Sequence, residues 1–235
     1  MTPLYTILPV VNRTDEFVIP KIKQINADGK RTYQTPSGKS YPSLTGVTGL
    51  MGREGIKAWR KAVGEQEANR VSRVASSRGT AMHNLAEYYV LQNEAKFNEA
   101  AEKAMPDAIH LFKTLQRKIS QGLEEVLAVE SQLYSDELEV AGTVDCIGKY
   151  FGKYAVMDWK TSRKKKEKSY ITNYFCQGAG YAKMWEERTG MKIDHILIFV
   201  ATEETGKTHL YHAYVDDYVD LLKDLREQFR NENNY

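Results

Sequence analysis

Short apolar segments separated by turn signals fill the second half of the chain and predict a β-sheet. Five of them have the length and the β-branched or aromatic content of strands: residues 125–134, 140–150, 154–161, 195–201 and 208–214. The run at 195–201 is apolar throughout, as in a strand buried on both faces, whereas 208–214 alternates like an outer strand. Helical patterns at 169–188, before Gly190, and at 215–230 flank these last two strands.

The first half of the chain is predicted to be a hairpin followed by helices. Residues 5–41 contain two turn signals, Asn-Ala-Asp-Gly and Pro-Ser-Gly, between segments of strand character. Residues 44–120 are mainly helical in pattern, with an expected helix at 55–63 and one long or two short helices over 65–92. A further helix begins at Pro106 and repeats apolar residues at helical spacing: Ala108, Leu111, Phe112, Leu115 and Ile119.

This order of elements predicts an α/β fold in which helices flank a mixed central β-sheet. We expect a single domain over residues 1–235. Within it, residues 1–43 form an N-terminal β-hairpin region, residues 44–120 a helical wall, and residues 121–235 the core built on the sheet. A chain of 235 residues is long enough to bury a substantial core of this kind.

Composition favours an intracellular protein. Apolar residues make up 42% of the chain and charged residues 27%, as in ordinary globular proteins. No apolar run approaches the ~20 residues of a membrane helix, and the N-terminus lacks the basic segment and cleavage site of a signal peptide. We therefore expect a cytoplasmic protein that does not enter a membrane, with Cys146 and Cys176 as reduced core residues.

Charge is distributed unevenly along the chain, although the net charge is only +2. Residues 153–168 contain seven basic and two acidic residues, and residues 53–78 contain seven basic and three acidic ones. Residues 216–232, by contrast, contain six acidic and three basic ones. Such basic stretches can form one face that binds a polyanion, or they can be ordinary solvated surface.

A group of residues suited to catalysis lies between Gly142 and Lys160. Asp145 lies within one predicted strand, and Asp158 and Lys160 lie two residues apart at the end of the next. Side chains two apart on a strand share a face, and a hairpin brings Asp145 close to that face. The two carboxylates can hold Mg²⁺ beside a phosphate, while lysine orients or deprotonates a water or stabilises the transition state. The alternative is a set of polar residues on a solvated face.

Two pairs of residues at helical spacing accompany this group. Gly79 and His83 are four residues apart and therefore share a helix face. Gln177 and Tyr181 have the same spacing, and Asn173 extends their face by one turn. Each pair taken alone is also compatible with a purely structural role. The pairs indicate a function only when they are considered together with the carboxylates, in the order in which all of these residues occur along the chain.

Taken in order, these motifs resemble the RecB-type branch of the PD-(D/E)xK nuclease superfamily. The order is G-x-x-x-H, a strand glutamate at Glu130, G-x-x-D at Gly142 and Asp145, D-x-K, and Q-x-x-x-Y, spread over residues 79–181. Residues 41–45 also resemble the corresponding segment of mitochondrial genome maintenance exonucleases and their phage-encoded relatives. The resemblance implies a restriction-endonuclease-like core with the N-terminal hairpin and the helical segment added to it.

The resemblance also implies roles for individual residues. The implied catalytic residues are Asp145, Asp158, Lys160, Gln177 and Tyr181. The implied metal ligands are His83, Glu130, Asp145 and Asp158, for Mg²⁺ or Mn²⁺. Residues that flank the motifs are expected to contact DNA: Arg78, Thr161, Ser162, Arg163, Lys164, Lys165, Lys166 and Asn173. Some relatives carry an iron–sulfur cluster on four cysteines, and we expect none here because one chain supplies only two.

The implied function is metal-dependent hydrolysis of DNA, preferably from single-stranded ends or flaps, in DNA replication, recombination, repair or phage DNA metabolism. An endonuclease or junction resolvase on the same fold is one alternative. A nucleic-acid-binding module with a relic site is another. The intact pair of aspartates with its lysine argues against the relic, because binding alone does not require those three residues.

Overall fold

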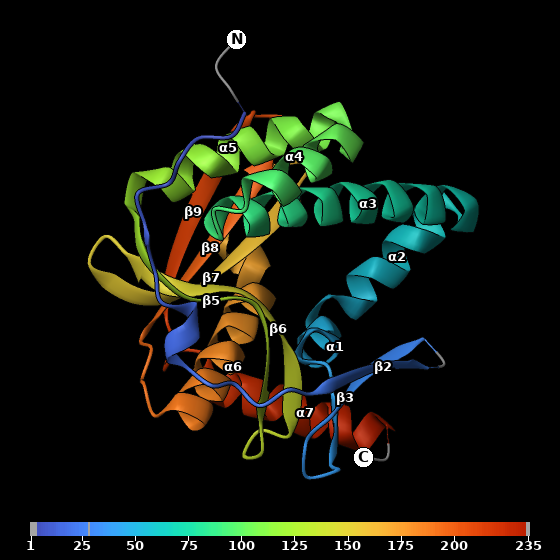
Figure 1. The fold of residues 1–235 in the computed structure, drawn as a ribbon. Coiled ribbons are helices and arrows are strands. Elements are labelled where there is room, and N and C mark those ends of the chain that lie inside the picture. Colours follow the sequence, from blue (N-terminus) through green and yellow to red (C-terminus); the bar gives the residue numbers. More distant parts are fainter. Residues whose placement is uncertain (1–3, 28, 234–235) are drawn as a thin grey trace.

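The structure is a computed structural model that describes residues 4–27 and 29–233 (Figure 1). Its centre is a six-stranded sheet with the order β1-β5-β6-β7-β8-β9. The strands are β1 (Val11–Asn12), β5 (Leu123–Ser135), β6 (Val140–Tyr150), β7 (Lys153–Ser162), β8 (His195–Thr202) and β9 (Lys207–Tyr214). β1 runs parallel to β5, and β7 runs parallel to β8, whereas the other neighbours are antiparallel. The sheet is therefore mixed, as predicted.

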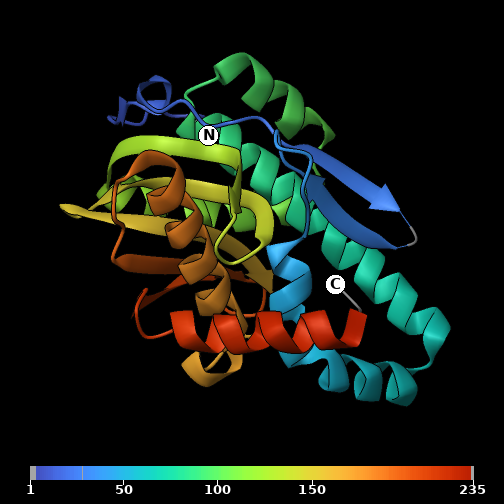
Figure 2. The ribbon, with the colours of Figure 1, turned by 90° about the horizontal axis from the view of Figure 1, so that it is seen from below.

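Helices cover both faces of this sheet and enclose a hydrophobic core on each. The α-helices of the described chain are α1 (Leu44–Thr48), α2 (Arg53–Val63), α3 (Glu65–Val90), α4 (Glu94–Lys103), α5 (Pro106–Gly122), α6 (Thr172–Thr189) and α7 (Val219–Asn233), and all but α2 pack on the sheet. α3, α4 and α5 pack on one face, and α1, α6 and α7 on the other (Figures 1 and 2). Because side chains alternate along β7, Val156 enters the core under α6, and Met157 and Trp159 enter the core under α5. The predicted α/β fold is confirmed.

The helical segment 44–120 includes an arm that projects from the sheet. α2 has no buried residue, and α3 buries its apolar residues mainly from Met82 onward. The two helices meet at Gly64, whose φ of 84° a residue with a side chain rarely adopts. Figure 1 shows α2 and the first half of α3 extending beyond the sheet, on the same side as the N-terminal hairpin and above it in this view. The predicted helix at 65–92 is therefore one long helix, of which only the second half is packed.

The N-terminal hairpin is part of a small three-stranded sheet formed by β2 (Lys23–Ala27), β3 (Lys30–Gln34) and β4 (Ser40–Pro42). The hairpin is confirmed, whereas β1 and β4 were not predicted. Residue 28 of the predicted turn lies outside the described residues. Tyr33 and Tyr41 are buried against Tyr134 and Ala141, which fixes the small sheet to the distal end of the β5–β6 hairpin.

Two helices begin later than predicted. The helix expected at 215 begins at Val219, because residues 215–218 form a turn in which the Tyr218 N–H donates to the Val215 carbonyl at 3.0 Å. The helix expected at 169 begins at Thr172, after a short 3-10 turn. α4 was not distinguished from its neighbours, because Phe97 is its only buried residue in the described chain.

α6 packs closely against the layers on both of its sides. A β-carbon at Gly178 would lie 2.4 Å from Ile196 Cγ2 on β8, and one at Gly180 would lie 2.8 Å from the Leu44 side chain on α1. Glycine at these positions, costly in a helix by roughly 1 kcal/mol each, thus allows the helix to approach its neighbours. Cys146 and Cys176 are free, buried thiols on opposite faces of the sheet. Within the residues described, no helix is long and apolar enough to cross a membrane.

Candidate active site

The candidate active site lies where the central sheet divides. The ladder between β6 and β7 stops at the Cys146–Met157 pair, after which β6 continues along β5 and β7 along β8. Asp145 is the next residue on β6, and its Oδ2 accepts the backbone N–H of Trp159 on β7 at 2.7 Å. The carboxylate thus accepts a backbone N–H that a strand carbonyl would accept in a continuous ladder, and this hydrogen bond fixes the position of the Asp145 side chain.

Three potential metal ligands from three elements converge at this point. His83 of α3, Glu130 of β5 and Asp145 of β6 each offer one ligand atom, and the three atoms lie within 4.8 Å of one another. His83 Nδ1 is 3.6 Å from Asp145 Oδ1 and 3.9 Å from Glu130 Oε1. Burial lowers the pKa of His83, but the Asp145 and Glu130 carboxylates outweigh that effect and leave the pKa raised above 6.5.

The backbone and the charges around Glu130 are both unfavourable without a cation. The ladder pairs formed by residues 129 and 131 place Glu130 directly opposite Asp145. Glu130 has a φ of 44°, in the left-handed region, which costs a residue with a side chain of order 1–3 kcal/mol. Like charges directly opposite on neighbouring strands repel each other. A cation between the two carboxylates would offset that repulsion, so these residues fit a bound divalent metal.

Asp158 and Lys160 form a buried ion pair beside this group. Lys160 Nζ lies 2.6 Å from both carboxylate oxygens of Asp158, but only Oδ1 has the geometry to accept a hydrogen bond. Oδ2 is therefore buried beside the ammonium but accepts no hydrogen bond from the described residues, so it can still accept one from a water or bind a cation. Burial raises the pKa of Asp158 to about 6, although Lys160 opposes it. Burial lowers the pKa of Lys160, but Asp158 and Asp145 outweigh it, so the net pKa is raised.

α6 contributes Gln177 and Tyr181, which lie side by side as their spacing predicts. Gln177 Nε2 donates to the Tyr181 hydroxyl at 3.3 Å, and both side chains are buried. Burial raises the pKa of Tyr181, so its hydroxyl stays protonated. A β-carbon at Gly142 would lie 2.9 Å from that hydroxyl oxygen, which explains the glycine three residues before Asp145. Asn173, one turn earlier on α6, is half-buried.

A cavity of about 400 Å³ collects most of these side chains. It brings together six residues predicted from the sequence: His83, Glu130, Asp145, Lys160, Gln177 and Tyr181. Its other lining residues are Gly79, Thr80, Asn84, Thr143, Arg31 and Thr45. Thr80 and Asn84 repeat the spacing of Gly79 and His83, so helical periodicity could have identified them. Thr45 of α1 lies in the 41–45 segment already noted for its resemblance, whereas Arg31 comes from the N-terminal sheet and no motif marks it.

The residues expected to contact DNA lie outside this cavity. Arg78 is paired with Glu203 at 2.6 Å, and Arg163 with Glu204 at 3.4 Å. Residues 164–166 follow the end of β7, with two lysines exposed and the third half-buried. For all three lysines, no ion pair is found within the described chain. DNA contacts at all these positions stay predictions.

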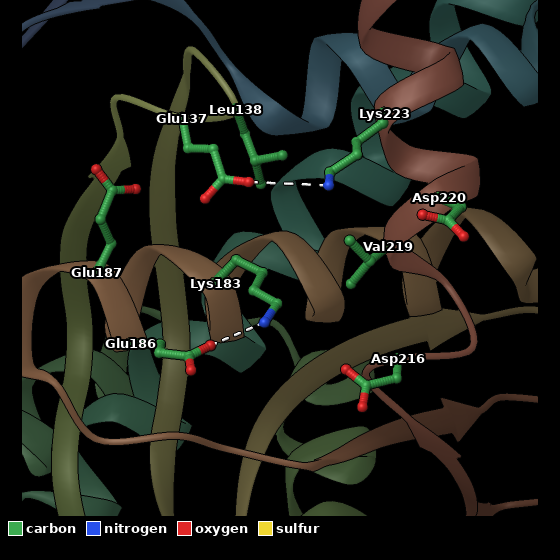
Figure 3. Close-up of a pocket in the computed structure, with 9 residues that line it drawn as sticks. All are labelled: Glu137, Leu138, Lys183, Glu186, Glu187, Asp216, Val219, Asp220 and Lys223. Carbon is green, nitrogen blue, oxygen red and sulfur yellow. Dashed lines mark hydrogen bonds and ion pairs between the residues drawn. The ribbon is translucent and has the colours of Figure 1, made fainter.

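A separate, acidic cavity of about 440 Å³ lies between the β5–β6 turn, α6 and α7 (Figure 3). Its charged lining consists of Glu137, Glu186, Glu187, Asp216, Asp220, Lys183 and Lys223. Both lysines pair with acids of the same cavity, at 2.8 Å to Glu186 and 3.8 Å to Glu137. The excess of acidic side chains would repel a phosphate backbone. This cavity contains none of the motif residues and does not compete with the site around Asp145.

The fold and the site define a nuclease: a mixed sheet with flanking helices, on which carboxylates, a histidine and a lysine share one cavity. Residues 57–234 match the PD-(D/E)XK nuclease superfamily, and the chain belongs to that superfamily.

Shorter stretches are similar to Mitochondrial genome maintenance exonuclease 1 from three vertebrates. Identity to the Xenopus tropicalis protein is 33% over 96 residues, which is 39% of this chain and 27% of that protein. The Mus musculus protein matches at 46% over 41 residues, or 17% of this chain and 12% of its own length. The Homo sapiens protein matches at 42% over 48 residues, or 20% and 14%. The matches thus span about a quarter or less of each relative.

Proposed function

We propose that this protein is a metal-dependent deoxyribonuclease that degrades DNA from single-stranded ends or flaps. The observation that carries the proposal is the convergence of His83, Glu130, Asp145 and Lys160 in one cavity, with the buried Asp158 paired to Lys160. Membership of a nuclease superfamily supports the hydrolytic part. Similarity to proteins named as exonucleases supports the requirement for an end.

The side chains divide the proposed work between them. His83, Glu130 and Asp145 would hold Mg²⁺ or Mn²⁺, and the second carboxylate oxygen of Asp158 would complete the ligand set directly or through water. A bound divalent cation lowers the pKa of water and neutralises charge on a phosphate. Lys160, held by Asp158, orients the attacking water and donates to the phosphate.

Gln177 and Tyr181 would brace the other side of the cavity. The Tyr181 hydroxyl keeps its proton and can donate it in a hydrogen bond to a phosphate oxygen, while Gln177 holds the hydroxyl in place. Outside the cavity, the strand would follow the polar and basic positions predicted from the sequence: Arg78, Thr161, Ser162, Arg163, Lys164, Lys165, Lys166 and Asn173. In this proposal residues 1–43, 44–120 and 121–235 act together as one nuclease domain.

The test compares linear and covalently circular single-stranded DNA of one sequence, with Mg²⁺, with Mn²⁺ and with EDTA. We expect metal-dependent loss of the linear strand only, and no loss with a Lys160→Gln variant. Loss of the circle at a similar rate would instead support an endonuclease or junction resolvase. Binding without hydrolysis of either substrate under every metal condition would support a relic binding module.

A further inference from the structure

Arg31 of β3 brings a positive charge to the proposed active site. Its side chain lines the same cavity as Asp145 and Lys160. Among the residues described, no carboxylate lies within ion-pair distance of it. Arg60 on the nearby arm differs, because it pairs with Glu65. A guanidinium that no carboxylate of the described residues neutralises, beside a proposed phosphodiesterase site, is available for a phosphate.

The fold holds Arg31 in position at the edge of the cavity. Its carbonyl accepts the Ser43 N–H at 3.0 Å, which links β3 to the start of α1. Its Nη2 donates to Thr45 Oγ1, and Thr45 also lines the cavity. This hydrogen bond uses one of the five guanidinium N–H groups, so the others can donate to a ligand. The buried Tyr33, two residues along the same strand face, anchors β3 to the main sheet.

Arg31 and Thr45 also mark the start of a groove that leads away from the site. Both line a second cavity, of about 490 Å³, between the N-terminal sheet, α1 and the end of α7. Thr45 and Gly46 line a third, of about 440 Å³, which continues along α1 to Arg53. Figures 1 and 2 show the N-terminal sheet, α1 and the end of α7 side by side. The shared residues place the three cavities next to one another, in a row from the site to Arg53.

We propose that Arg31 binds a backbone phosphate adjacent to the one that is cleaved, and that the groove over α1 holds the nucleotides that follow in a single strand. This inference rests on the proposed function, because it assumes that the cavity binds a nucleic acid. Lys30, the neighbour of Arg31, lines the second cavity and adds positive charge to the path. The ligand is a single-stranded nucleic-acid backbone, recognised through phosphate and not through base identity.

The test measures binding separately from hydrolysis. Anisotropy of a fluorescein-labelled oligothymidylate gives Kd in EDTA over a range of salt concentrations, for wild type, Arg31→Gln and Arg31→Glu. We expect Arg31→Gln to weaken binding about tenfold and to reduce the slope of log K against log salt by about 0.7. Arg31→Glu should reduce the slope by about 1.4, because it removes one attraction and adds one repulsion. With metal present, kcat/KM should fall in the same order.

Lys23→Gln is the matched control. Lys23 lies on the same hairpin, but its register partner is Gln34, so it points to the opposite face from Arg31, and it lines none of the three cavities. Its Kd and slope should stay within twofold of wild type. Wild-type slopes in both Arg31 variants, or equal losses in the Lys23 control, would overturn the inference. Failure of wild type to hydrolyse DNA, with Arg31-dependent binding retained, would instead overturn the proposed function alone.

Discussion

Replacing Gly178 by alanine tests how the packing of α6 on the sheet determines the geometry of the site. A β-carbon at this position would lie 2.4 Å from Ile196 Cγ2, more than 1 Å inside an ordinary carbon–carbon separation of about 3.5–4.0 Å. Ile196 is fully buried in β8 and is stiff at its first side-chain torsion, so it cannot turn away. α6 must therefore move outward, and it carries Gln177 and Tyr181 with it.

Two opposing contributions set the size of the effect. Alanine is favoured over glycine inside a helix by about 1 kcal/mol, whereas overpacking a filled core costs about 1–3 kcal/mol. The net expectation for Gly178→Ala is a decrease of about 1 kcal/mol in unfolding free energy, or about 2–4 °C in Tm for a chain of this size. Activity should fall further, because displacement of catalytic groups by about 1 Å can cost a factor of about a hundred.

Gly55→Ala is the matched control, since no atom of the described residues lies within 4 Å of a β-carbon built at Gly55 on α2. It should raise stability by about 0.5–1 kcal/mol and leave activity unchanged. Both variants are compared with wild type by thermal and urea unfolding followed by circular dichroism. When Ile196 is also replaced by alanine, Gly178→Ala should no longer decrease the unfolding free energy, because the clashing side chain is gone. If Gly178→Ala stabilises the protein as Gly55→Ala does, α6 does not pack tightly enough on β8 to require the glycine.

Four further outcomes are expected. Lys160→Gln should abolish hydrolysis while thermal unfolding still shows a folded protein; turnover near the wild-type rate would refute its catalytic role. Replacing Mg²⁺ by Mn²⁺ should raise the activity of His83→Ala less than that of wild type, because imidazole suits Mn²⁺ better than Mg²⁺. Identical metal titrations of the two proteins would indicate that His83 has a structural role. Neutralising the lysines at 164–166 should lower the salt slope of single-strand binding by about 0.7 for each phosphate that a lysine no longer neutralises, and an unchanged slope would mean that this stretch is solvated surface. Glu125, bound by Arg13, has its pKa lowered to about 2, so its contribution to stability is complete above pH 4.5 and is lost as the pH falls toward 2. Glu125→Gln should therefore cost about 1 kcal/mol at pH 7, with a deficit in Tm that shrinks below pH 4.5; a deficit independent of pH would contradict this reasoning.

Local signals were sufficient for five of the six strands of the main sheet in the described chain and for most helices. β5 to β9 are long enough for composition and turns to define them. Pro106 marks the start of α5, because proline is tolerated in the first turn of a helix, and Gly190 marks the end of α6, because glycine readily adopts the positive φ found there. β1 and β4 are two and three residues long, and they exist because β5 and β3 pair with them. No local pattern encodes such a partner. α7 was extended too far because Val215 and Tyr218 mimic helical spacing while forming a turn.

The mutual positions of the candidate site residues were predictable where these residues belong to ordered motifs. The two-residue period of a strand placed Asp158 and Lys160 together, and the structure pairs them. Two features needed three-dimensional information. First, the Trp159 N–H is free to bind Asp145 because β6 and β7 separate after their last ladder pair, and the point of separation depends on how the two strands run in space. Second, Arg31 reaches the cavity only because the small N-terminal sheet docks on β5 and β6.

The close approach of Gly142 and Tyr181 couples two motifs that sequence comparison treats as separate. Since any side chain at 142 would displace the tyrosine hydroxyl, substitution there is tolerable only after the tyrosine has been replaced or moved. Mutational paths through this pair are therefore ordered: the tyrosine can change first, and the glycine cannot. In an aligned set of such chains, the glycine should vary only where the tyrosine is absent, so that a tyrosine at 181 predicts a glycine at 142 but a glycine does not predict the tyrosine.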